Sequence, residues 1–255
     1  MAQPNFSLSG KVALITGGSR GIGKATALGF ARAGADVAIA SRTLPDLEIV
    51  ANEIRSFGGK ALPVAAHVGK LEQTKNLVQT VQREFGRIDI LVNNAGTSPA
   101  LSGMLDIEER LWDSIMNLNL KGLVFLSQAV ARIMKEHGGS IINVASIAGY
   151  MHEQNVGIYS ISKAAVVQAT KIMAEEWAEY NIRVNAIAPG HMHTRLGDSI
   201  FEAIPEYKKV FLDRVPMKRI GDPDEIVGAM IYLASDASSY VTGTTIVADG
   251  GTLTT

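Results

Sequence analysis

Residues 14–25 read LITGGSRGIGKA, and this stretch joins a short apolar run to the start of a helical pattern. It matches two kinds of site. The spacing Gly17-x-Ser19-x-Gly21 is that of the elbow that presents a nucleophilic serine in hydrolases. Gly17, Gly21 and Gly23 together match a loop whose backbone binds phosphates at the start of a helix. The place of the stretch in the chain decides between the two.

A hydrolase elbow needs an oxyanion loop earlier in the chain. Only the short, mostly polar segment 1–10 precedes this strand, so the sequence leaves no room for such a loop. Three glycines also exceed what an elbow requires, whereas close approach of the backbone to a pyrophosphate needs residues without a Cβ atom. We therefore interpret the stretch as the phosphate loop of a dinucleotide site. A glycine-rich turn without a ligand is the remaining alternative, because the spacing differs from the commonest fingerprint, G-x-G-x-x-G.

Short apolar runs rich in valine and isoleucine recur along the chain, separated by segments of helix length such as 71–86 and 224–235. The runs are VALIT (12–16), DVAIAS (36–41), ALPVAA (61–66), IDILVN (88–93), SIINVAS (140–146) and IRVNAIA (182–188). Continuous rather than alternating apolarity indicates burial on both faces of a parallel sheet. We predict one α/β domain over residues 1–255, a Rossmann-like, doubly wound parallel sheet of about seven strands with helices on both faces.

The alternation ends after Ala188, where the segment 189–222 carries glycine, proline, scattered apolar residues and charge. A long excursion of this kind is more often a binding loop than an idle connection. We expect this segment to form a lid over a substrate.

Composition limits the partners. The chain has 255 residues, of which 47% are hydrophobic, and a formal net charge of -1 with interspersed signs. We expect no nucleic-acid partner and no membrane, since no basic patch and no apolar stretch of roughly 20 residues occurs. The chain has no cysteine, so disulfides and thiolate catalysis are excluded. The N-terminal residues lack the pattern of a secretory signal, and we expect a cytoplasmic protein.

The end of the second run carries information on the dinucleotide. An NAD site places an acidic residue about twenty residues after the glycine loop, where it binds the ribose 2′-hydroxyl. Here the position reads Ser41-Arg42-Thr43. Arg42, with Arg20 from the glycine loop, suits a 2′-phosphate, because guanidinium groups bind phosphate with a bidentate fork. We predict NADP as the cofactor, although arginines at strand ends are also commonly just solvated.

A second pattern lies at Tyr159 and Lys163, which stand four residues apart and hence on one face of a helix. Lowering the pKa of a tyrosine from about 10 to about 7 requires about 4 kcal/mol. One ammonium group about 4 Å away supplies that energy at an effective dielectric near 20. An isolated Y-x-x-x-K pattern is more often a tyrosine and a lysine on a helix face that have no catalytic role. Ser160-x-x-Lys163 also fits a penicillin-binding motif, but neither SDN nor KTG occurs in the chain.

Taken together, these motifs resemble the short-chain dehydrogenase/reductase family, in its single-domain NADP-type subgroup, which includes tetrameric carbonyl reductases and 3-oxoacyl-ACP reductases. The match spans essentially the whole chain and follows the family's order: TGGSRGIG (16–23), NNAG (93–96), Asn119, Ser146, YSISK (159–163) and PG (189–190).

The resemblance implies an NADP(H)-dependent oxidoreductase that interconverts a ketone and a secondary alcohol. Ser146 would orient the substrate oxygen, Tyr159 would be the acid/base, Lys163 would acidify Tyr159 and hold the nicotinamide ribose, and Asn119 would hold a water in a proton relay. The cofactor would be bound by Gly17, Ser19, Arg20, Gly21, Ile22, Gly23, Ser41, Arg42, His67, Val68, Asn94, Ala95, Gly96, Tyr159, Lys163, Pro189, Gly190, Met192 and Thr194.

One residue departs from the family's pattern. Where the family commonly has an aspartate that touches adenine, this chain has His67. A histidine donates or accepts depending on its tautomer, so adenine recognition would persist with altered geometry. The string HVGK at 67–70 looks like that of the tetrameric NADPH-dependent carbonyl reductases. The resemblance also implies a homotetramer, built on the helices after Met104 and Gly157 and on the final strand 244–247.

The substrate remains open at this stage. The segment 150–156, with His152, Glu153 and Gln154, and the lid, with His191, Met192, His193, Phe201 and Phe211, would surround a small carbonyl or alcohol. A ketone, a sugar or polyol oxidised with NAD(H), and a 3-oxoacyl thioester are all compatible, and we favour a broad ketone or secondary-alcohol substrate. No metal is expected, because two histidines lack a third ligand. A non-catalytic NADP sensor or scaffold is the alternative of another class.

Overall fold

The computed structural model describes residues 4–152, 155–195, 197–198, 201 and 205–254. Its centre is one parallel sheet with the strand order β3-β2-β1-β4-β5-β6-β7. The strands are β1 (Val12–Thr16), β2 (Asp36–Ser41), β3 (Ala61–Ala65), β4 (Ile90–Asn93), β5 (Gly139–Val144), β6 (Ile182–Pro189) and β7 (Thr245–Ala248). The predicted doubly wound parallel sheet is confirmed.

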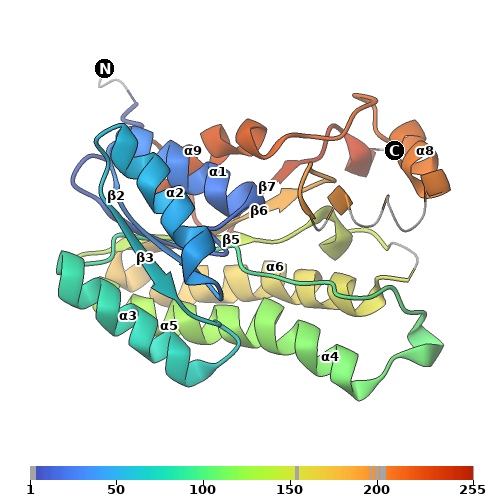
Figure 1. The fold of residues 1–255 in the computed structure, drawn as a ribbon, viewed down its shortest axis with the longest axis horizontal. Helices are drawn as coiled ribbons and strands as arrows, with labels where there is room; N and C mark the ends of the chain where they lie inside the picture. The colour runs from blue at the N-terminus through green and yellow to red at the C-terminus, as the bar shows by residue number, and fades with distance from the viewer. Residues whose placement is uncertain (1–3, 153–154, 196, 199–200, 202–204, 255) are drawn as a thin grey trace.

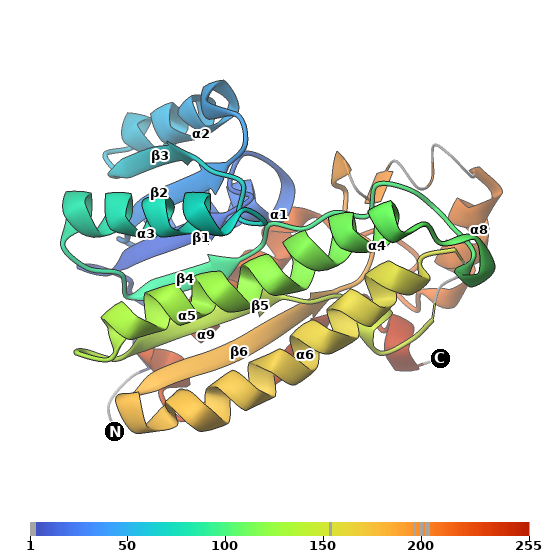
Figure 2. The same cartoon turned by 90° about the horizontal axis from the view of Figure 1, so that it is seen from below.

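Helices cover both faces of the sheet (Figure 1). One layer consists of α1 (Gly21–Arg32), α2 (Leu44–Ser56) and α9 (Val227–Ala234). The other layer consists of α3 (Leu71–Phe85), α4 (Glu109–Met116), α5 (Leu123–Met134) and α6 (Gly157–Trp177). Figure 2 shows this second layer in front of the sheet, with α8 (Pro205–Arg214) beyond one end of it.

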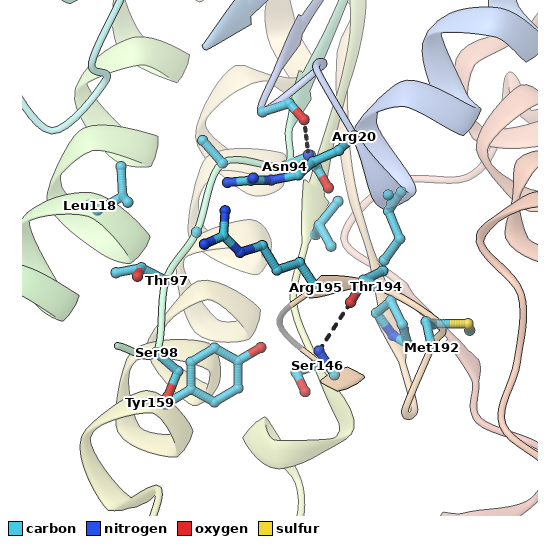
Figure 3. Close-up of a pocket in the computed structure, with 18 of the residues that line it drawn as sticks. Arg20, Asn94, Thr97, Ser98, Leu118, Ser146, Tyr159, Met192, Thr194 and Arg195 are labelled. Carbon is cyan, nitrogen blue, oxygen red and sulfur yellow. Dashed lines mark hydrogen bonds between the residues drawn. The ribbon is translucent and has the colours of Figure 1, made fainter. Parts of the chain in front are cut away.

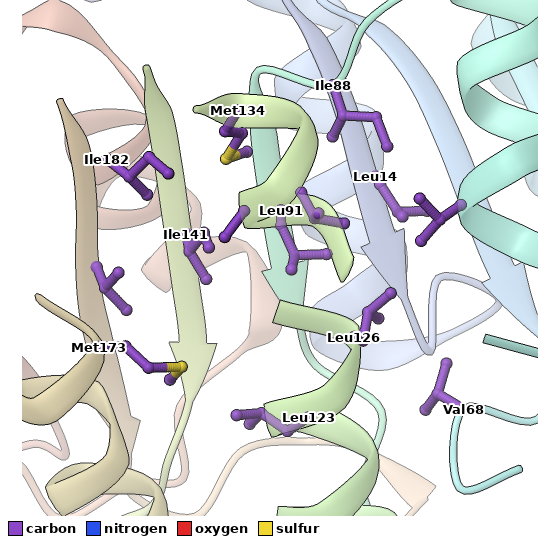
Figure 4. Packing of buried hydrophobic residues seen from close by; sticks show 14 of the residues in the cluster. Leu14, Val68, Ile88, Leu91, Leu123, Leu126, Met134, Ile141, Met173 and Ile182 are labelled. Atoms are coloured by element: carbon purple, nitrogen blue, oxygen red, sulfur yellow. The ribbon is translucent and has the colours of Figure 1, made fainter. Parts of the chain in front are cut away.

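The two layers explain the continuous apolar runs. Successive strand side chains point to opposite faces, so Ala13 and Ile15 pack toward α1, α2 and α9, whereas Leu14 packs toward α3, α5 and α6. Figure 4 shows this second core, in which Leu91 and Ile141 of the sheet meet helix residues. Because both faces are covered by apolar side chains, a strand that alternated with polar residues would bury them without partners.

Some helices and strands begin at other residues than predicted, because side chains form hydrogen bonds with the backbone there. β4 begins at Ile90 rather than Ile88, because Asp89 turns its carboxylate to the backbone N–H of Val12 at 2.9 Å. The final helix begins as a 3₁₀ turn, Pro223–Ile226, capped reciprocally by Asp222 and Glu225. The stretch NLNLKG forms a π-helical turn, Asn117–Gly122, between α4 and α5.

Within the described residues, no helix is both long and apolar enough to cross a membrane.

Candidate active site

A cavity of about 740 Å³ lies at the carboxyl ends of β1, β2, β4, β5 and β6 (Figure 3). This edge of an open parallel sheet is where ligands bind, and the volume is typical of small-ligand sites. Arg20, Arg42, Lys163 and Arg195 line the cavity, and the described residues around it include no aspartate or glutamate. The cavity therefore attracts anions.

The glycine loop follows β1 and forms one wall. Gly17 has a φ of +65°, and a Cβ atom there would lie 2.6 Å from Asn94 Nδ2. A Cβ atom on Gly23 would lie 2.2 Å from the Gly17 carbonyl oxygen. Helix α1 begins at Gly21, and no side chain caps its first N–H groups. The glycines thus allow a tight turn that leaves the helix N-terminus open toward the cavity, as phosphate binding requires.

Asn94 fixes this loop to the end of β4. Its Nδ2 donates to the carbonyl oxygens of Thr16 at 2.9 Å and Gly17 at 3.2 Å. In return, the hydroxyl of Thr16 accepts the backbone N–H groups of Asn94 and Ala95, both at 3.1 Å. Asn93 points away from the cavity into the core, where its Nδ2 donates to Ser127 and Asn143. Of the two asparagines, only Asn94 and its neighbours Ala95 and Gly96 form the cavity wall.

The end of β2 carries Ser41 and Arg42, and both line the cavity. His67, after β3, lies beside them. The backbone N–H of Gly69 donates to His67 Nδ1 at 3.1 Å, and burial, followed by the charges of Arg42 and Lys70, lowers the His67 pKa. The imidazole is therefore neutral at pH 7 with its hydrogen on Nε2. An aspartate at this position would offer only acceptors, whereas His67 offers a donor.

Ser146 and Tyr159 face the same cavity from two elements. Ser146 follows β5, and its hydroxyl accepts the backbone N–H of Ala148 at 3.1 Å. Tyr159 lies in the first turn of α6. Figure 3 shows both side chains in the same part of the cavity, below the guanidinium groups of Arg20 and Arg195. Both hydroxyl groups thus belong to one candidate ligand site.

Lys163 lies one turn after Tyr159 and is buried, with 4% of its surface exposed. Its Nζ donates to the Val144 carbonyl oxygen at 2.7 Å and lies 5.6 Å from the centre of the Tyr159 ring. Two opposite unit charges at that separation would attract each other by about 3 kcal/mol at an effective dielectric near 20, less than at about 4 Å. Burial lowers the Lys163 pKa to about 8.

Asn119 lies behind the cavity rather than in its wall. It sits in the π-helical turn, accepts the backbone N–H of Thr97 at 2.8 Å and donates to the Thr97 carbonyl at 3.0 Å. It also donates to Ser162 Oγ at 3.1 Å, and that hydroxyl donates to the Tyr159 carbonyl at 2.7 Å. Asn119 therefore connects the wall after β4 with the helix that carries Tyr159 and Lys163.

Most of the predicted site residues meet in this one cavity. Apart from Asn119, the exception is Gly23, which packs beneath the Gly17 carbonyl and does not line it. The predicted residues that line the cavity are Gly17, Ser19, Arg20, Gly21, Ile22, Ser41, Arg42, His67, Val68, Asn94, Ala95, Gly96, Ser146, Tyr159, Lys163, Pro189, Gly190, Met192 and Thr194.

Several expected substrate contacts lie elsewhere. His193 pairs with Asp198 at 3.2 Å and does not line the cavity. The rings of Phe201 and Phe211 pack against His191, with centroids 5.0 Å and 4.1 Å from its ring, in a small separate core under α8. His191 itself does line the cavity. Glu153 and Gln154 lie outside the described residues.

The cavity also contains residues that the sequence did not indicate. Arg195 lines it immediately after Thr194, and so do three hydroxyl-bearing residues, Thr97, Ser98 and Ser114. No motif surrounds Arg195, and the hydroxyl-bearing residues sit in a loop and on α4, so their convergence depends on the fold. The only sequence signal was the general one, that the segment 189–222 belongs to the site.

Comparisons with known proteins fit this geometry. The sequence model of the family described as Enoyl-(Acyl carrier protein) reductase matches residues 17–253. The chain is 42% identical over 250 residues to 2-dehydro-3-deoxy-D-gluconate 5-dehydrogenase of Dickeya dadantii, covering 97% of each chain. It is 42% identical over 246 residues to the 3-oxoacyl-[acyl-carrier-protein] reductase of Thermotoga maritima, covering 96% of this chain and 98% of that protein.

Two solved structures are similar over almost the whole chain. A short-chain type dehydrogenase/reductase from Mycobacterium marinum is 44% identical, covers 97% of each chain and gives a TM-score of 0.92. A gluconate 5-dehydrogenase from Burkholderia cenocepacia, solved in complex with NADP and tartrate, is 36% identical with a TM-score of 0.94. The match covers 99% of this chain and 98% of the Burkholderia cenocepacia chain.

Gly23→Ala tests the packing of the glycine loop. The new Cβ atom would overlap the Gly17 carbonyl, so the loop must shift, and we expect the free energy of unfolding to fall by about 1–3 kcal/mol. Gly228→Ala is the matched control, because that helical glycine has open space around it and alanine favours helix by up to about 1 kcal/mol. Urea unfolding measures both variants, and equal stability of the two would contradict the packing described.

Lys163→Met tests the buried ammonium through pH. In the unfolded chain the lysine pKa is about 10.4, and in the fold it is about 8, so between these values the folded state binds fewer protons and becomes more stable as pH rises. Relative to Lys163→Met, the wild type should gain about 2 kcal/mol between pH 7.5 and pH 10. Urea unfolding of both cofactor-free proteins at both pH values measures this gain. A stability difference that does not change with pH would rule out the lowered pKa.

Proposed function

The chain belongs to the short-chain dehydrogenase/reductase family and is an oxidoreductase that acts on CH–OH groups, and from this premise we propose that it uses NADP(H) with Tyr159 as acid/base. The observation that carries the proposal is the meeting of Ser146, Tyr159 and Lys163 with the glycine loop in one cavity. The reaction interconverts a ketone and a secondary alcohol.

The cavity fits a dinucleotide. The Gly17 turn excludes a Cβ atom, and the start of α1 presents N–H groups that no side chain caps. These features suit a pyrophosphate, and the lack of carboxylates among the described lining residues suits a polyanion. Lys163 would hold the nicotinamide ribose, and Thr194, Pro189 and Gly190 would form the opposite wall.

NADP rather than NAD is proposed on the charge at the end of β2. Arg42 and Arg20 both line the cavity, and no acidic residue takes the place that would bind a ribose 2′-hydroxyl. His67 would add its Nε2 hydrogen as a donor to the adenine, which has ring nitrogens as acceptors. The similar Burkholderia cenocepacia structure was solved with NADP, which supports the same choice here.

In the proposed mechanism, bound NADPH supplies a hydride to the carbonyl carbon, or NADP⁺ accepts it in oxidation. Ser146 donates a hydrogen bond to the substrate oxygen and fixes its position. Tyr159 gives that oxygen a proton during reduction and takes one during oxidation. Lys163 stabilises the phenolate that this transfer leaves on Tyr159, because its charge is close and screened from water.

Asn119 is proposed as a positioning residue rather than a ligand of substrate. Through Ser162 it contacts the backbone of Tyr159, and through Thr97 it contacts the cavity wall. A water between this turn and Lys163 would complete the proton relay. π-Helical turns often occur at functional sites, and here the turn brings the amide between two elements of the site.

The substrate is proposed to be a small ketone or secondary alcohol with polar substituents. Thr97, Ser98 and Ser114 supply hydroxyl groups to the cavity that Tyr159 also lines. Two of the similar proteins are named for a gluconate derivative and for a 3-oxoacyl thioester, and the hydroxyl-lined wall favours the first kind of substrate. A non-catalytic NADP sensor would need no acid/base pair, whereas Tyr159 and Lys163 are both in place.

The whole chain is proposed to act as one cofactor-binding domain with the lid at 189–222, assembled as a homotetramer. Exposed apolar side chains on α4, α5, α6 and β7 support the assembly, among them Trp112, Phe125, Ile172 and Val247. Light scattering at micromolar concentration should give four times the chain mass, and a monomer would refute the assembly. The cytoplasmic location stays a prediction.

Tyr159→Phe should reduce turnover by at least about 100-fold, because the substrate oxygen loses its proton donor. The NADPH dissociation constant, measured by nucleotide fluorescence, should change little, since the ring and Lys163 remain. Steady-state assays with the best carbonyl substrate give the turnover. Activity near that of the wild type would refute the role of the tyrosine.

Arg42→Asp should invert the cofactor preference. The new carboxylate repels a 2′-phosphate and accepts a hydrogen bond from a ribose 2′-hydroxyl, so kcat/KM for NADPH relative to NADH should fall by about 100-fold or more. Arg83→Asp, an exposed position on α3, is the matched control for charge. The 2′-phosphate assignment fails if the two variants have the same NADPH/NADH ratio.

A further inference from the structure

Arg195 extends from the segment after β6 into the middle of the cavity. Figure 3 shows its guanidinium between that of Arg20 and the ring of Tyr159, and all three residues line the cavity. The side chain is exposed at the open mouth rather than packed against the protein surface. A ligand that reaches Tyr159 would therefore pass within reach of this cation.

Three other basic residues of the same segment have partners within the chain. Arg219 forms two hydrogen bonds to Glu225, both 2.6 Å, His193 pairs with Asp198 at 3.2 Å, and Lys218 donates to the Asp213 carbonyl at 2.7 Å. Among the described residues, Arg195 has no hydrogen bond and no ion pair. Arg20, another cation, lines the same cavity, and an anion bound there would interact favourably with both charges.

The proposed cofactor would bind the cations at the other end of the cavity. The glycine loop and the start of α1 suit the pyrophosphate, and Arg42 with Arg20 suits the 2′-phosphate. Arg195 is the guanidinium nearer to Tyr159, where the reacting oxygen lies in the proposed mechanism. It is therefore placed for the substrate rather than for the adenosine.

We propose that Arg195 binds a carboxylate of the substrate, so that the enzyme acts on an oxo acid and the corresponding hydroxy acid. The planar fork of the guanidinium matches a carboxylate with two parallel hydrogen bonds. Thr97, Ser98 and Ser114 line the same cavity and supply hydroxyl partners. This inference rests on the proposed function, because it assigns the substrate of the site at Tyr159.

The test compares acids with matched neutral compounds. Reduction of acetoacetate is compared with that of methyl acetoacetate, and oxidation of D-gluconate with that of D-glucitol, using wild type, Arg195→Gln and the surface control Arg83→Gln. In Arg195→Gln, we expect the kcat/KM of the acid divided by that of the neutral compound to fall about tenfold, because one hydrogen-bonded ion pair with the substrate is lost. In Arg83→Gln the same ratio should stay unchanged.

A second measurement does not depend on turnover. Calorimetric titration of the NADPH complex with tartrate, as a probe carboxylate, should show binding in the wild type and at least about tenfold weaker binding in Arg195→Gln. The dissociation constants for NADPH and NADH should stay within about twofold of the wild type, because the phosphates have other partners.

The outcomes separate the possibilities. Equal loss of NADPH and NADH affinity, with an unchanged acid-to-neutral ratio, would assign Arg195 to the pyrophosphate and overturn the inference. Unchanged ratios and unchanged tartrate binding would overturn it as well. Absence of turnover of any carbonyl or alcohol by the wild type would instead refute the proposed function, and the tartrate titration would still test Arg195.

Discussion

The ammonium group of Lys163 is buried beneath the active-site cavity, and the proposed chemistry depends on it. An ammonium at 4% exposure loses most of its hydration, which is unfavourable unless other groups compensate. The Val144 carbonyl compensates in part through a hydrogen bond of 2.7 Å, and the remaining penalty appears as a pKa of about 8. The fold thus keeps a cation near the Tyr159 ring at a cost in stability, which is common at functional sites.

The sheet makes this arrangement possible. Val144 is the last residue of β5, so the carbonyl that holds Lys163 and the hydroxyl of Ser146 come from the same strand end. The glycine loop reaches the same edge from β1, and Asn94 binds it to the end of β4. Because parallel strands end together, side chains that are far apart in sequence converge without long-range connections of their own. In the proposed mechanism, the residues of this edge divide into a phosphate-binding half and a reacting half.

The sequence predicted the features that depend on local rules. Continuous apolar runs predicted the buried parallel strands, because both faces of the sheet are covered. The glycine spacing and the i, i+4 relation of Tyr159 and Lys163 predicted groups that the fold brings together. Boundaries that depend on a single tertiary hydrogen bond, such as the start of β4 at Asp89, were not predictable. Neither was the convergence of Arg195 on the cavity, since an arginine in a loop has no periodicity to place it. For Asn119, the family resemblance gave the residue, and only the structure gave its partners, Thr97 and Ser162.

The proposed chemistry requires one substrate oxygen to be held by two hydroxyl groups, one of which lies one helical turn from a buried cation. A crystal structure of the protein with NADP⁺ and a slowly reacting alcohol tests it most directly. The account predicts that the alcohol oxygen lies within about 3 Å of both Tyr159 Oη and Ser146 Oγ, with the nicotinamide ring against the reacting carbon. An alcohol oxygen that contacts neither hydroxyl, or a nicotinamide bound away from Tyr159, would contradict it.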